Sequence, residues 1–374
     1  MRYDFVVIGG GIAGASAGYA LAAHGAVVVL EREDQPGYHS TGRSAAQYTA
    51  LYGNRTIRAL TRLGKGFFDA PPSGFTEHPI LTPRGALFVV TAAQREKMRD
   101  LAAFAGGEAV PVRELTKDET LAMVPVLRPD AFDCGLHEPE STDIDVHALH
   151  HGYLRGLRAR GGRVVTGAAV TGLTRAAGRW RVQSRAGDFD APVVVNAAGA
   201  WADVVAALAG VRPVGLVPKR RTAMLFDPPD GLDCAAWPLT IDMDEQWYFK
   251  PDAGRLFGSP ADETPIEPCD VQPEELDLAI AVDRIEKATS LKIGAIAHRW
   301  AGLRSFVADK SLVIGFAPDA DGFFWLAGQG GYGIQTSPAA SAAAAGLIVN
   351  GRLPDAFDEY ALSPADLAPA RLLR

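Results

Sequence analysis

The segment Val6–Gly14 places the strongest constraint on what this 374-residue chain can fold into. It joins an apolar, β-branched run directly to a glycine-rich turn. A helical stretch of small residues follows from Ala13 to His24, and a second apolar run, Val27–Leu30, ends at the acid Glu31. This order is that of a βαβ unit with the dinucleotide-binding fingerprint in its proper context. The sequence therefore predicts a nucleotide-binding domain that begins almost at residue 1.

Each residue of the fingerprint has a physical role to fill. Gly9 permits the tight turn, Gly11 lets the backbone approach a pyrophosphate, and Gly14 lets the helix pack closely on the strand. The helix N-terminus offers free N–H groups and a positive dipole to phosphates. Glu31 stands where a carboxylate can accept hydrogen bonds from both ribose hydroxyls of an adenosine. A glycine-rich turn in an ordinary α/β core is the alternative, and it leaves Glu31 without a role.

Composition narrows the class of protein further. The chain is too long for one simple core, and 48% hydrophobic with 22% charged residues indicates sizeable buried cores. A net charge of -7 argues against binding to nucleic acid or to an anionic membrane surface. Cys134, Cys234 and Cys269 form no CxxC pair, which favours a reducing, cytoplasmic location. We find no run of about 18 apolar residues and expect no membrane span. The apolar N-terminus lacks a basic leader and is expected to be a buried strand.

Secondary-structure signals recur along the chain. A helix is expected over 146–160, capped by Asp145 and stopped by Gly161 and Gly162. A long, closely packed helix, Ala-rich over 339–346, is expected after 328–333, with Ser337 and Pro338 near its start. Short strands are expected at Arg163–Thr166, Trp180–Gln183, Pro192–Asn196 and Phe323–Ala327.

These signals predict an α/β protein of two domains. A Rossmann-like FAD-binding domain is expected to be discontinuous, formed by 1–75, 146–210 and 309–374. Alternating patterns such as 222–226 and 239–249 predict a mixed or antiparallel sheet in a substrate-binding domain formed by 76–145 and 211–308. A nucleotide domain assembled from both ends of the chain fits a flavoprotein better than an NAD-dependent dehydrogenase.

Seven blocks in a fixed order carry a resemblance that spans essentially the whole chain. The blocks are 30–33 with 37–46, 195–201, 218–221, 250–254, 300–306 and 330–336. The chain resembles the D-amino-acid oxidase (DAO) family of FAD-dependent oxidoreductases, and within it the bacterial D-arginine dehydrogenases. The resemblance implies FAD, held non-covalently although some relatives attach the flavin through a residue in the region of His39. It implies as cofactor-binding residues Gly9, Gly11, Ile12, Ala13, Gly14, Glu31, Arg32, Thr41, Gly42, Arg43, Ser44, Ala45, Ala46, Ala198, Gly199, Trp201, Gly302, Arg304, Gly330, Gly331, Tyr332, Gly333, Ile334 and Gln335.

The resemblance also implies a substrate site. Arg304 and Arg221 would hold an α-carboxylate, which guanidinium recognises bidentately, and Tyr248 would place its hydroxyl on the same group. Trp247 and Phe249 would face the other side of their strand. Tyr52 would be the tip of a mobile lid over residues 45–57. The neighbours Arg220 and Lys219 are expected to be solvated surface charges.

The implied reaction is oxidative deamination of a D-amino acid. A hydride would pass from Cα to flavin N5, and water would convert the imino acid to a 2-oxo acid and ammonia. Carbonyls of the loop with Gly331 and Tyr332 would accept from the amine, and the following helix N-terminus would stabilise negative charge on the reduced flavin. The pattern leaves open whether oxygen or a quinone-like acceptor reoxidises the flavin.

Two departures from the D-arginine dehydrogenase pattern bear on the substrate. Gln47 stands where a His is expected near the substrate, and Ala86 stands where an acid would pair with a cationic side chain. The expected substrate-binding residues, which include Gln47 and Gly331, therefore lack an acid to pair with a cationic substrate. They favour substrates with neutral, often apolar, side chains, unless Glu77 or Asp242 supplies the negative charge.

Other functions stay open at this point. A glycine or sarcosine-type amine oxidase and a 2-hydroxy-acid dehydrogenase share this fold, and a non-catalytic flavin-binding subunit is the alternative from another class. His147, His150 and His151 lack an accompanying carboxylate, so no metal site is expected.

Overall fold

A six-stranded sheet forms the centre of the first lobe in the computed structural model, which describes residues 1–373. Its strands are short, buried and rich in Val, Ile and Phe, as expected for a sheet covered on both faces. All neighbours pair in parallel except the edge strand β20. The order is β20 (Val313–Phe316), β21 (Phe323–Ala327), β13 (Val193–Asn196), β1 (Phe5–Ile8), β2 (Val27–Leu30) and β9 (Arg163–Val165).

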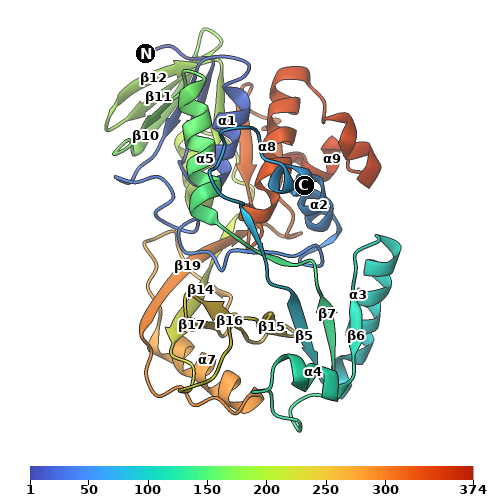
Figure 1. The fold of residues 1–374 in the computed structure, drawn as a ribbon. Coiled ribbons are helices and arrows are strands. Elements are labelled where there is room, and N and C mark those ends of the chain that lie inside the picture. Colours follow the sequence, from blue (N-terminus) through green and yellow to red (C-terminus); the bar gives the residue numbers. More distant parts are fainter. Residues whose placement is uncertain (374) are drawn as a thin grey trace.

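Helices cover one face of this sheet. The side chains of Val7, Val29 and Val195 pack there against small and aliphatic residues of the surrounding helices. Small residues such as Ala343 and Ala344 allow the helices to approach closely. The covering helices are α1 (Ile12–Leu21), α2 (Arg55–Asp69), α5 (Val146–Ala159) and α8 (Gly333–Asn350), with α9 (Pro364–Leu367) beside them (Figure 1).

A small antiparallel sheet and one short helix cover the opposite face. Val6, Val28 and Val194 point to this side and pack with Trp180 and Phe189 of the small sheet. The first lobe is therefore a three-layer arrangement. The covering elements are β10 (Val170–Ala176), β11 (Arg179–Ser184), β12 (Gly187–Ala191) and α6 (Ala202–Leu208).

The second lobe is built on a nine-stranded sheet. Its core contains aromatic residues of the central strands and apolar residues of the helix over 275–288. The strands are β5 (Ala86–Val90), β6 (Arg113–Leu115), β7 (Cys134–Glu138), β14 (Val217–Phe226), β15 (Leu239–Asp242), β16 (Tyr248–Asp252), β17 (Arg255–Ser259), β18 (Thr264–Pro265) and β19 (His298–Phe306), and the helices are α3 (Arg95–Gly107), α4 (Lys117–Met123) and α7 (Glu275–Ala288).

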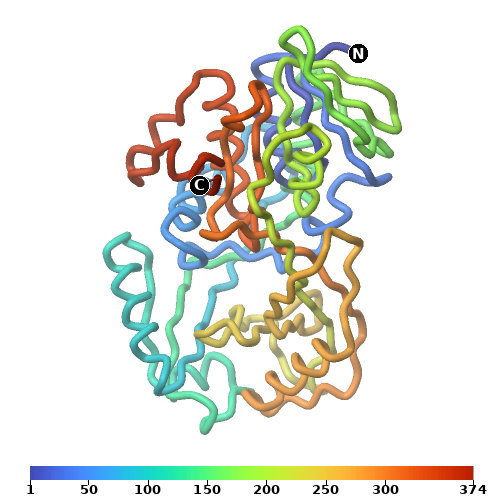
Figure 2. The backbone as a smooth tube through the Cα atoms, turned by 180° about the vertical axis from the view of Figure 1, so that it is seen from behind, coloured from blue at the N-terminus to red at the C-terminus, as the bar shows by residue number. Residues whose placement is uncertain are grey.

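The chain passes between the two lobes several times. Seen from behind, both ends of the chain and its green middle part lie in one lobe, and the teal and yellow to orange parts lie in the other (Figure 2). A small sheet of β3 (Gln47–Tyr48), β8 (Thr142–Ile144) and β4 (Leu81–Pro83) joins the connecting segments. This topology brings residues far apart in sequence to one boundary. Within residues 1–373, no helix combines the length and apolar character that a membrane crossing requires.

Most expected elements are present, and several differ in their boundaries. Helix α5 ends one residue short of the predicted 146–160, and the Asp145 side chain accepts from Ala148 N at 2.8 Å. The alternating stretch 239–249 is two antiparallel strands around a turn, which periodicity alone did not separate. Helix α8 begins at Gly333 and includes Pro338. Ser337 Oγ donates to the Ile334 carbonyl, which Pro338 cannot bond.

The turn between β1 and α1 depends on backbone contact that only glycine allows. Gly9 has a φ of +106°, and a Cβ added at Gly14 would stand 1.8 Å from the Gly9 carbonyl oxygen. A methyl group at residue 14 cannot be accommodated without moving the helix away from the strand.

We expect Gly14→Ala to lower the free energy of unfolding by about 1–3 kcal/mol, as overpacked sites do, and to reduce the flavin content of the purified protein. Gly66→Ala is the matched control, because residue 66 lies in α2 with no atom near an added Cβ. That change should be neutral or stabilising by about 0.5 kcal/mol. Urea unfolding and flavin absorbance measure both effects, and equal behaviour of the two variants would contradict the packing argument.

Candidate active site

A cavity of about 250 Å³ opens beyond the carboxyl ends of β1, β2 and β13, the edge where α/β sheets bind nucleotides. We call it the nucleotide cavity. Among the predicted cofactor-binding residues, it is lined by Gly9, Gly11, Ile12, Ala13, Glu31, Arg32, Thr41, Ala198, Gly199, Trp201 and Gly330.

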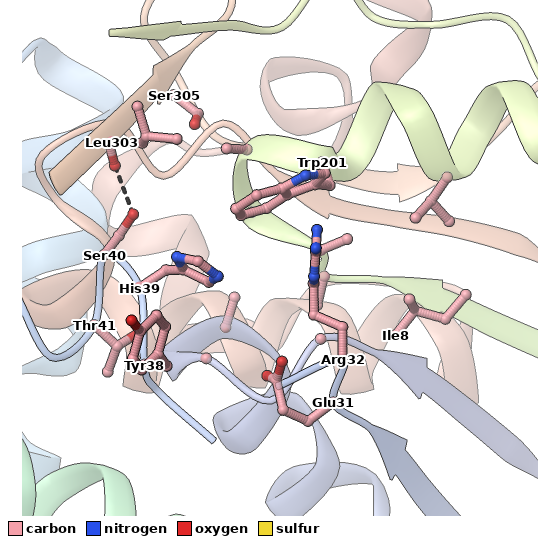
Figure 3. A pocket seen from close by; sticks show the side chains of 18 of the residues that line it. Ile8, Glu31, Arg32, Tyr38, His39, Ser40, Thr41, Trp201, Leu303 and Ser305 are labelled. Carbon is pink, nitrogen blue, oxygen red and sulfur yellow. Dashed lines mark hydrogen bonds between the residues drawn. The ribbon is translucent and has the colours of Figure 1, made fainter. Parts of the chain in front are cut away.

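Glu31 is fixed at the end of β2 with its carboxylate toward this cavity (Figure 3). Its Oε2 accepts from Gly10 N at 2.8 Å and its Oε1 accepts from Glu33 N at 2.9 Å. Each oxygen retains acceptor capacity, since a carboxylate offers about four lone-pair sites. The acid is therefore preorganised to receive hydroxyl donors.

The glycine-rich turn is held from two further directions. Thr41 Oγ1 accepts from Ile12 N at 3.0 Å, and a Cβ at Gly11 would stand 3.2 Å from that oxygen. His150 Nε2 donates to the Gly10 carbonyl at 2.8 Å, and burial lowers the pKa of His150, which favours the neutral ring. The histidine spacing suggested His150 only as a possible metal ligand, and this supporting contact was not predicted, because residues 10 and 150 meet only in the folded chain.

Aromatic and cationic planes gather at the mouth of the nucleotide cavity. The Arg32 guanidinium lies 4.7 Å from the centroid of the Trp201 ring, and the His39 ring lies 4.7 Å from the same ring (Figure 3). His39 Nε2 pairs with Glu33 Oε1 at 2.9 Å. Flat groups of this kind stack well on a planar heterocycle.

A second cavity continues from the first, and we call it the reaction cavity. The two share residues of the 40–41 segment and of the loop before α8, so they form one continuous cleft. The reaction cavity is lined by Ile12, Ser40, Thr41, Arg43, Ser44, Ala45, Arg221, Ala223, Tyr248, Phe257, Gly302, Leu303, Arg304, Gln329, Gly330, Gly331, Gly333 and Ile334.

Two arginines enter the reaction cavity from paired strands. In the antiparallel register of β14 and β19, Arg221 lies opposite Gly302 and Lys219 lies opposite Arg304. Arg221 Nε donates to the Asp262 carbonyl at 2.8 Å, and Arg304 Nη1 donates to the Tyr52 hydroxyl at 2.9 Å. Burial opposes the charge on Arg304, but the surrounding phenols and Glu245 outweigh it and raise its pKa, so this guanidinium stays protonated.

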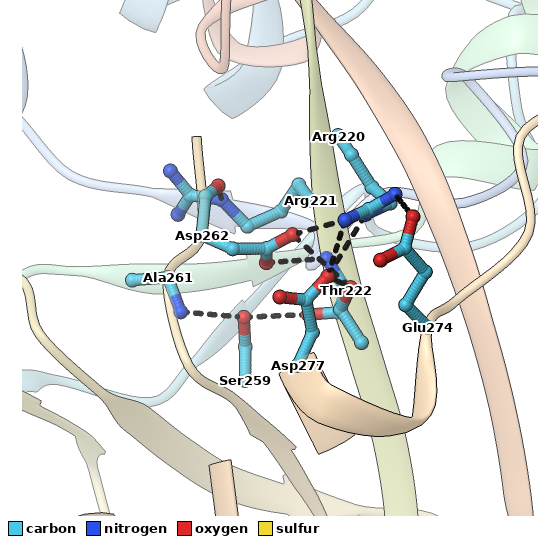
Figure 4. A network of polar contacts seen from close by, with 8 residues as sticks. All are labelled: Arg220, Arg221, Thr222, Ser259, Ala261, Asp262, Glu274 and Asp277. Atoms are coloured by element: carbon cyan, nitrogen blue, oxygen red, sulfur yellow. Dashed lines mark hydrogen bonds and ion pairs between the residues drawn. The ribbon is translucent and has the colours of Figure 1, made fainter. Parts of the chain in front are cut away.

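Arg220 is not the solvated surface charge that the sequence suggested. Its side chain is 5% exposed and pairs with Asp277 at 2.8 Å, with Glu274 and, at 3.8 Å, with Asp262 (Figure 4). Side chains alternate along β14, so Arg220 points away from the reaction cavity toward α7 and the 262 segment. A motif cannot reveal this environment because its acids lie more than forty residues away. Lys219 is mostly covered as well and pairs with Glu263 at 2.8 Å.

Asp262 connects this network to Arg221. Its carboxylate accepts from Thr222 N at 2.6 Å and from Thr222 Oγ1 at 3.1 Å, while its carbonyl accepts from Arg221 Nε (Figure 4). The network therefore holds the backbone that orients Arg221.

Two tyrosines face the arginines. Tyr248 lines the reaction cavity, while Trp247 and Phe249 lie in the core of the second lobe, as the strand alternation predicted. Burial disfavours a Tyr248 phenolate, but the positive charges of Arg304 and Arg221 outweigh burial and lower its pKa. For Tyr52, burial outweighs the charge of Arg304 and raises the pKa.

Several predicted residues do not line either cavity. Gly14, Gly42, Ala46 and Tyr332 are not among the lining residues, and Gln335 instead bonds Thr49 and Thr61. Tyr52 is not a lining residue either, although its hydroxyl meets Arg304. Gln47 also lies outside, and its Nε2 donates to Ser141 Oγ at 2.7 Å. The Arg43 guanidinium turns to Asp270 and to the carbonyls of Val271 and Ala301.

The cleft fits a flavin dinucleotide. Gly11 at the α1 N-terminus has no side-chain cap, the Cβ-free turn leaves room for phosphates, and Glu31 faces the ribose position. The stacking groups around Trp201 suit the adenine, and the loop 328–333 leads to the α8 N-terminus beside the reaction cavity. These features define a two-lobed α/β protein with a dinucleotide-type cleft that continues to a cavity lined by two arginines.

Comparisons with known proteins identify the family. The model of the FAD-dependent oxidoreductase (DAO) family matches residues 4–347. The chain is 26% identical to glycine oxidase of Bacillus licheniformis, covering 93% of each chain, and 26% identical to human mitochondrial sarcosine dehydrogenase, covering 93% of this chain and 40% of that one. The crystal structure of L-proline dehydrogenase from P. horikoshii superposes with a TM-score of 0.86 at 22% identity, over 100% of this chain and 98% of that one. The chain belongs to the DAO family and is an FAD-dependent oxidoreductase.

The lowered pKa of Tyr248 predicts how carboxylate binding depends on pH. As the pH rises through that pKa, a phenolate forms beside the arginines and repels a bound carboxylate. Benzoate, which has no amine to titrate, should therefore bind about tenfold more weakly per pH unit above this pKa. In Tyr248→Phe, the affinity for benzoate should not show this fall at alkaline pH.

Titration of the flavin absorbance with benzoate at several pH values measures the effect. Tyr52→Phe is the control. Because the pKa of Tyr52 is raised, this variant should keep the fall in benzoate affinity at alkaline pH that the wild type shows. If benzoate affinity falls at alkaline pH in Tyr248→Phe as it does in the wild type, a group other than Tyr248 titrates.

Proposed function

We propose that the protein catalyses oxidative deamination of D-amino acids with neutral, mainly apolar side chains, giving 2-oxo acids and ammonia by way of imino acids. The observation that carries this proposal is the pair Arg221 and Arg304 in a cavity whose side-chain end is apolar. The D configuration rests on the resemblance of the seven sequence blocks to bacterial D-arginine dehydrogenases, which stays a prediction.

The arginines and tyrosines suit an α-carboxylate. Arg304 and Arg221 present two guanidinium groups from neighbouring strands, and each is oriented by a protein contact before substrate arrives. Planar guanidinium can bond both oxygens of a carboxylate. The hydroxyls of Tyr52 and Tyr248 would complete the anion site.

Holding the carboxylate fixes the position of the substrate Cα. The bound flavin supplies the acceptor for the hydride that leaves Cα. Carbonyls of the 330–332 loop would accept from the substrate amine, and the N-terminus of α8, at Gly333, would favour negative charge on the neighbouring ring. Alignment of this kind requires no side-chain nucleophile.

The side-chain end of the cavity is apolar, because Ala45, Ala223 and Phe257 line it beside Tyr248. Ala86 does not line the cavity itself; it is 1% exposed and packs in the same cluster as Tyr248 and Phe257. Neither acid considered as a substitute for the missing charge reaches this cluster. Glu77 is exposed, and the Asp242 carboxylate accepts from Gln94 Nε2 and from Asp244 N and Gln246 N. A cationic side chain would lose water among these apolar residues.

A second candidate is oxidation of a secondary amine such as sarcosine, or of glycine. It is favoured by the similarity to glycine oxidase and sarcosine dehydrogenase over 93% of the chain. These substrates carry the same carboxylate, so the arginine pair is compatible with them. The side-chain end of the cavity then determines which of these substrates is preferred.

Anaerobic flavin reduction separates these candidates. D- and L-amino acids, glycine, sarcosine and 2-hydroxy acids are mixed with the oxidised protein, and loss of absorbance near roughly 450 nm is followed. We expect neutral D-amino acids to reduce the flavin fastest, and Arg304→Met to slow the reaction at low substrate concentration by at least about 100-fold, as loss of a charged hydrogen-bond partner does. Reduction by sarcosine alone would favour the second candidate, and no reduction by any compound would favour a non-catalytic subunit. Peroxide release in air separates oxygen from a quinone-like acceptor.

Ala86→Glu tests the basis of side-chain preference. The new carboxylate should raise the ratio of kcat/KM for D-arginine over D-leucine by about tenfold or more, since one ion pair in a sheltered site is worth at least about 1.4 kcal/mol. Ala86→Gln has nearly the same size without the charge and is the matched control. If the wild-type enzyme already prefers D-arginine, the argument from Ala86 is wrong. The proposed class of enzyme would be unaffected.

A further inference from the structure

A buried carboxylate outside both cavities has no role in the chemistry described above. Glu138 is the last residue of β7 in the second lobe and is 1% exposed. Burial raises the pKa of Glu138 to about 7 from its ordinary 4.5, so keeping an acid here is costly. Burying an apolar side chain at this position would cost less free energy. The contacts of the carboxylate indicate why an acid is present.

Both carboxylate oxygens bond the lid segment. Oε1 accepts from Ala50 N at 2.8 Å, and Oε2 accepts from Thr49 Oγ1 at 2.5 Å. Thr49 Oγ1 in turn accepts from Leu51 N at 3.3 Å. One side chain of the second lobe therefore orders three consecutive residues that lead directly to Tyr52.

The first lobe holds the same residues from the other side. Gln335 of α8 bonds both backbone groups of Thr49, accepting from its N at 3.2 Å and donating to its carbonyl at 3.3 Å. Gln335 Nε2 also donates to Thr61 Oγ1 at 2.8 Å. Thr49 and Ala50 are thus fixed between the lobes by two buried side chains.

The position of Tyr52 depends on the tethered residues Thr49 and Ala50. Its hydroxyl meets Arg304 Nη1 at 2.9 Å, and its ring packs edge-on against Tyr332 with 4.8 Å between centroids. The next anchor along the chain is Asn54, which caps α2 and donates to Ser311 Oγ at 2.9 Å. Tyr52 therefore lies in a short span between two tethered points.

We propose that Glu138 is a positioning residue: its two bonds to Thr49 and Ala50 hold the lid segment so that the Tyr52 hydroxyl stands at Arg304, ready for a substrate carboxylate. This inference rests on the proposed function of Arg304 and Tyr52 as a carboxylate site. Release of Glu138 would leave Tyr52 at Arg304 in only a fraction of molecules, and apparent affinity falls in proportion to that fraction.

The nearby charged groups do not replace Glu138. Glu140 lines the same small cavity as Glu138 but is exposed and bonds no lid residue. Arg62 pairs with Glu108, and Lys65 pairs with Asp69. Arg58 lies over the ring of Phe104 with 4.2 Å to the centroid, and its charge lowers the pKa of Glu138 without a direct bond.

Four substitutions in the holoenzyme isolate the role. Glu138→Ala removes both bonds. Glu138→Gln keeps an acceptor for Ala50 N and supplies an N–H for Thr49 Oγ1, so it is the conservative rescue. Glu140→Ala removes a neighbouring acid that touches no lid residue. Thr49→Val removes one of the two bonds without touching Glu138 and serves if Glu138→Ala does not fold.

Two readouts need no turnover. Hydrogen exchange of peptides covering 47–53 reports the Ala50 amide, and benzoate titration of the flavin absorbance reports the carboxylate site. For Glu138→Ala we expect at least about tenfold faster exchange in 47–53 and about tenfold weaker benzoate binding. Glu138→Gln should stay within about threefold of wild type, and Glu140→Ala should match it. The limiting rate of flavin reduction at saturating substrate should change less than the half-saturating concentration.

The outcomes separate this role from a merely structural one. Exchange that rises equally in α5 and in 47–53, or benzoate affinity in Glu138→Ala equal to that of Glu140→Ala, would overturn the inference. In the double variant Glu138→Ala/Thr49→Val, a loss smaller than the sum of the two single losses would support it, because both changes remove the bond between Thr49 and Glu138, although Thr49→Val also removes the bond from Leu51 N. If no amino acid reduces wild-type flavin while exchange and benzoate binding respond as expected, the proposed function fails and the positioning role stands.

Discussion

The close approach of Gly14 to the Gly9 carbonyl is the contact on which the rest of the site depends. It sets how near α1 lies to β1, and thereby where the free N–H groups at the start of the helix point. Glu31 and His150 then hold Gly10 through its two backbone groups. Because the nucleotide and reaction cavities share Ile12, a shift of this turn would move the cofactor relative to the substrate arginines.

Strand alternation sorts the charges of the reaction cavity. Along β14, Arg221 faces the cavity and pairs with Glu263 at 3.3 Å, while Arg220 faces Asp277, Glu274 and Asp262 on the other side. A register slip of one residue would exchange the two guanidinium groups and bring Arg220 to the cavity without its orienting contacts. Thr222 and Arg220 hold the Asp262 carboxylate, and the Asp262 carbonyl orients Arg221, so the two neighbouring arginines are coupled although they face opposite sides.

Local patterns predicted the parts of the site that are contiguous in sequence. The βαβ unit, the Asp145 cap and the opposite faces of Trp247 and Tyr248 follow from periodicity and turn chemistry. The environments of Arg220 and Gln335 did not follow, because their partners come from distant segments. Gln335 meets Thr49 across 286 residues of sequence, and no spacing rule connects such positions.

Residue identity and short-range order were enough to predict a dinucleotide-binding protein of mixed α/β architecture, because glycine geometry and the acid after the second strand act within one βαβ unit. The oxidoreductase class followed from the resemblance of the seven sequence blocks to the DAO family. Folding decided which charges face the cavity, which are neutralised in the core, and which buried acid secures the Tyr52 segment. These outcomes depend on contacts between lobes, and the free energy of a buried charge is set by its spatial neighbours and not by its neighbours along the chain.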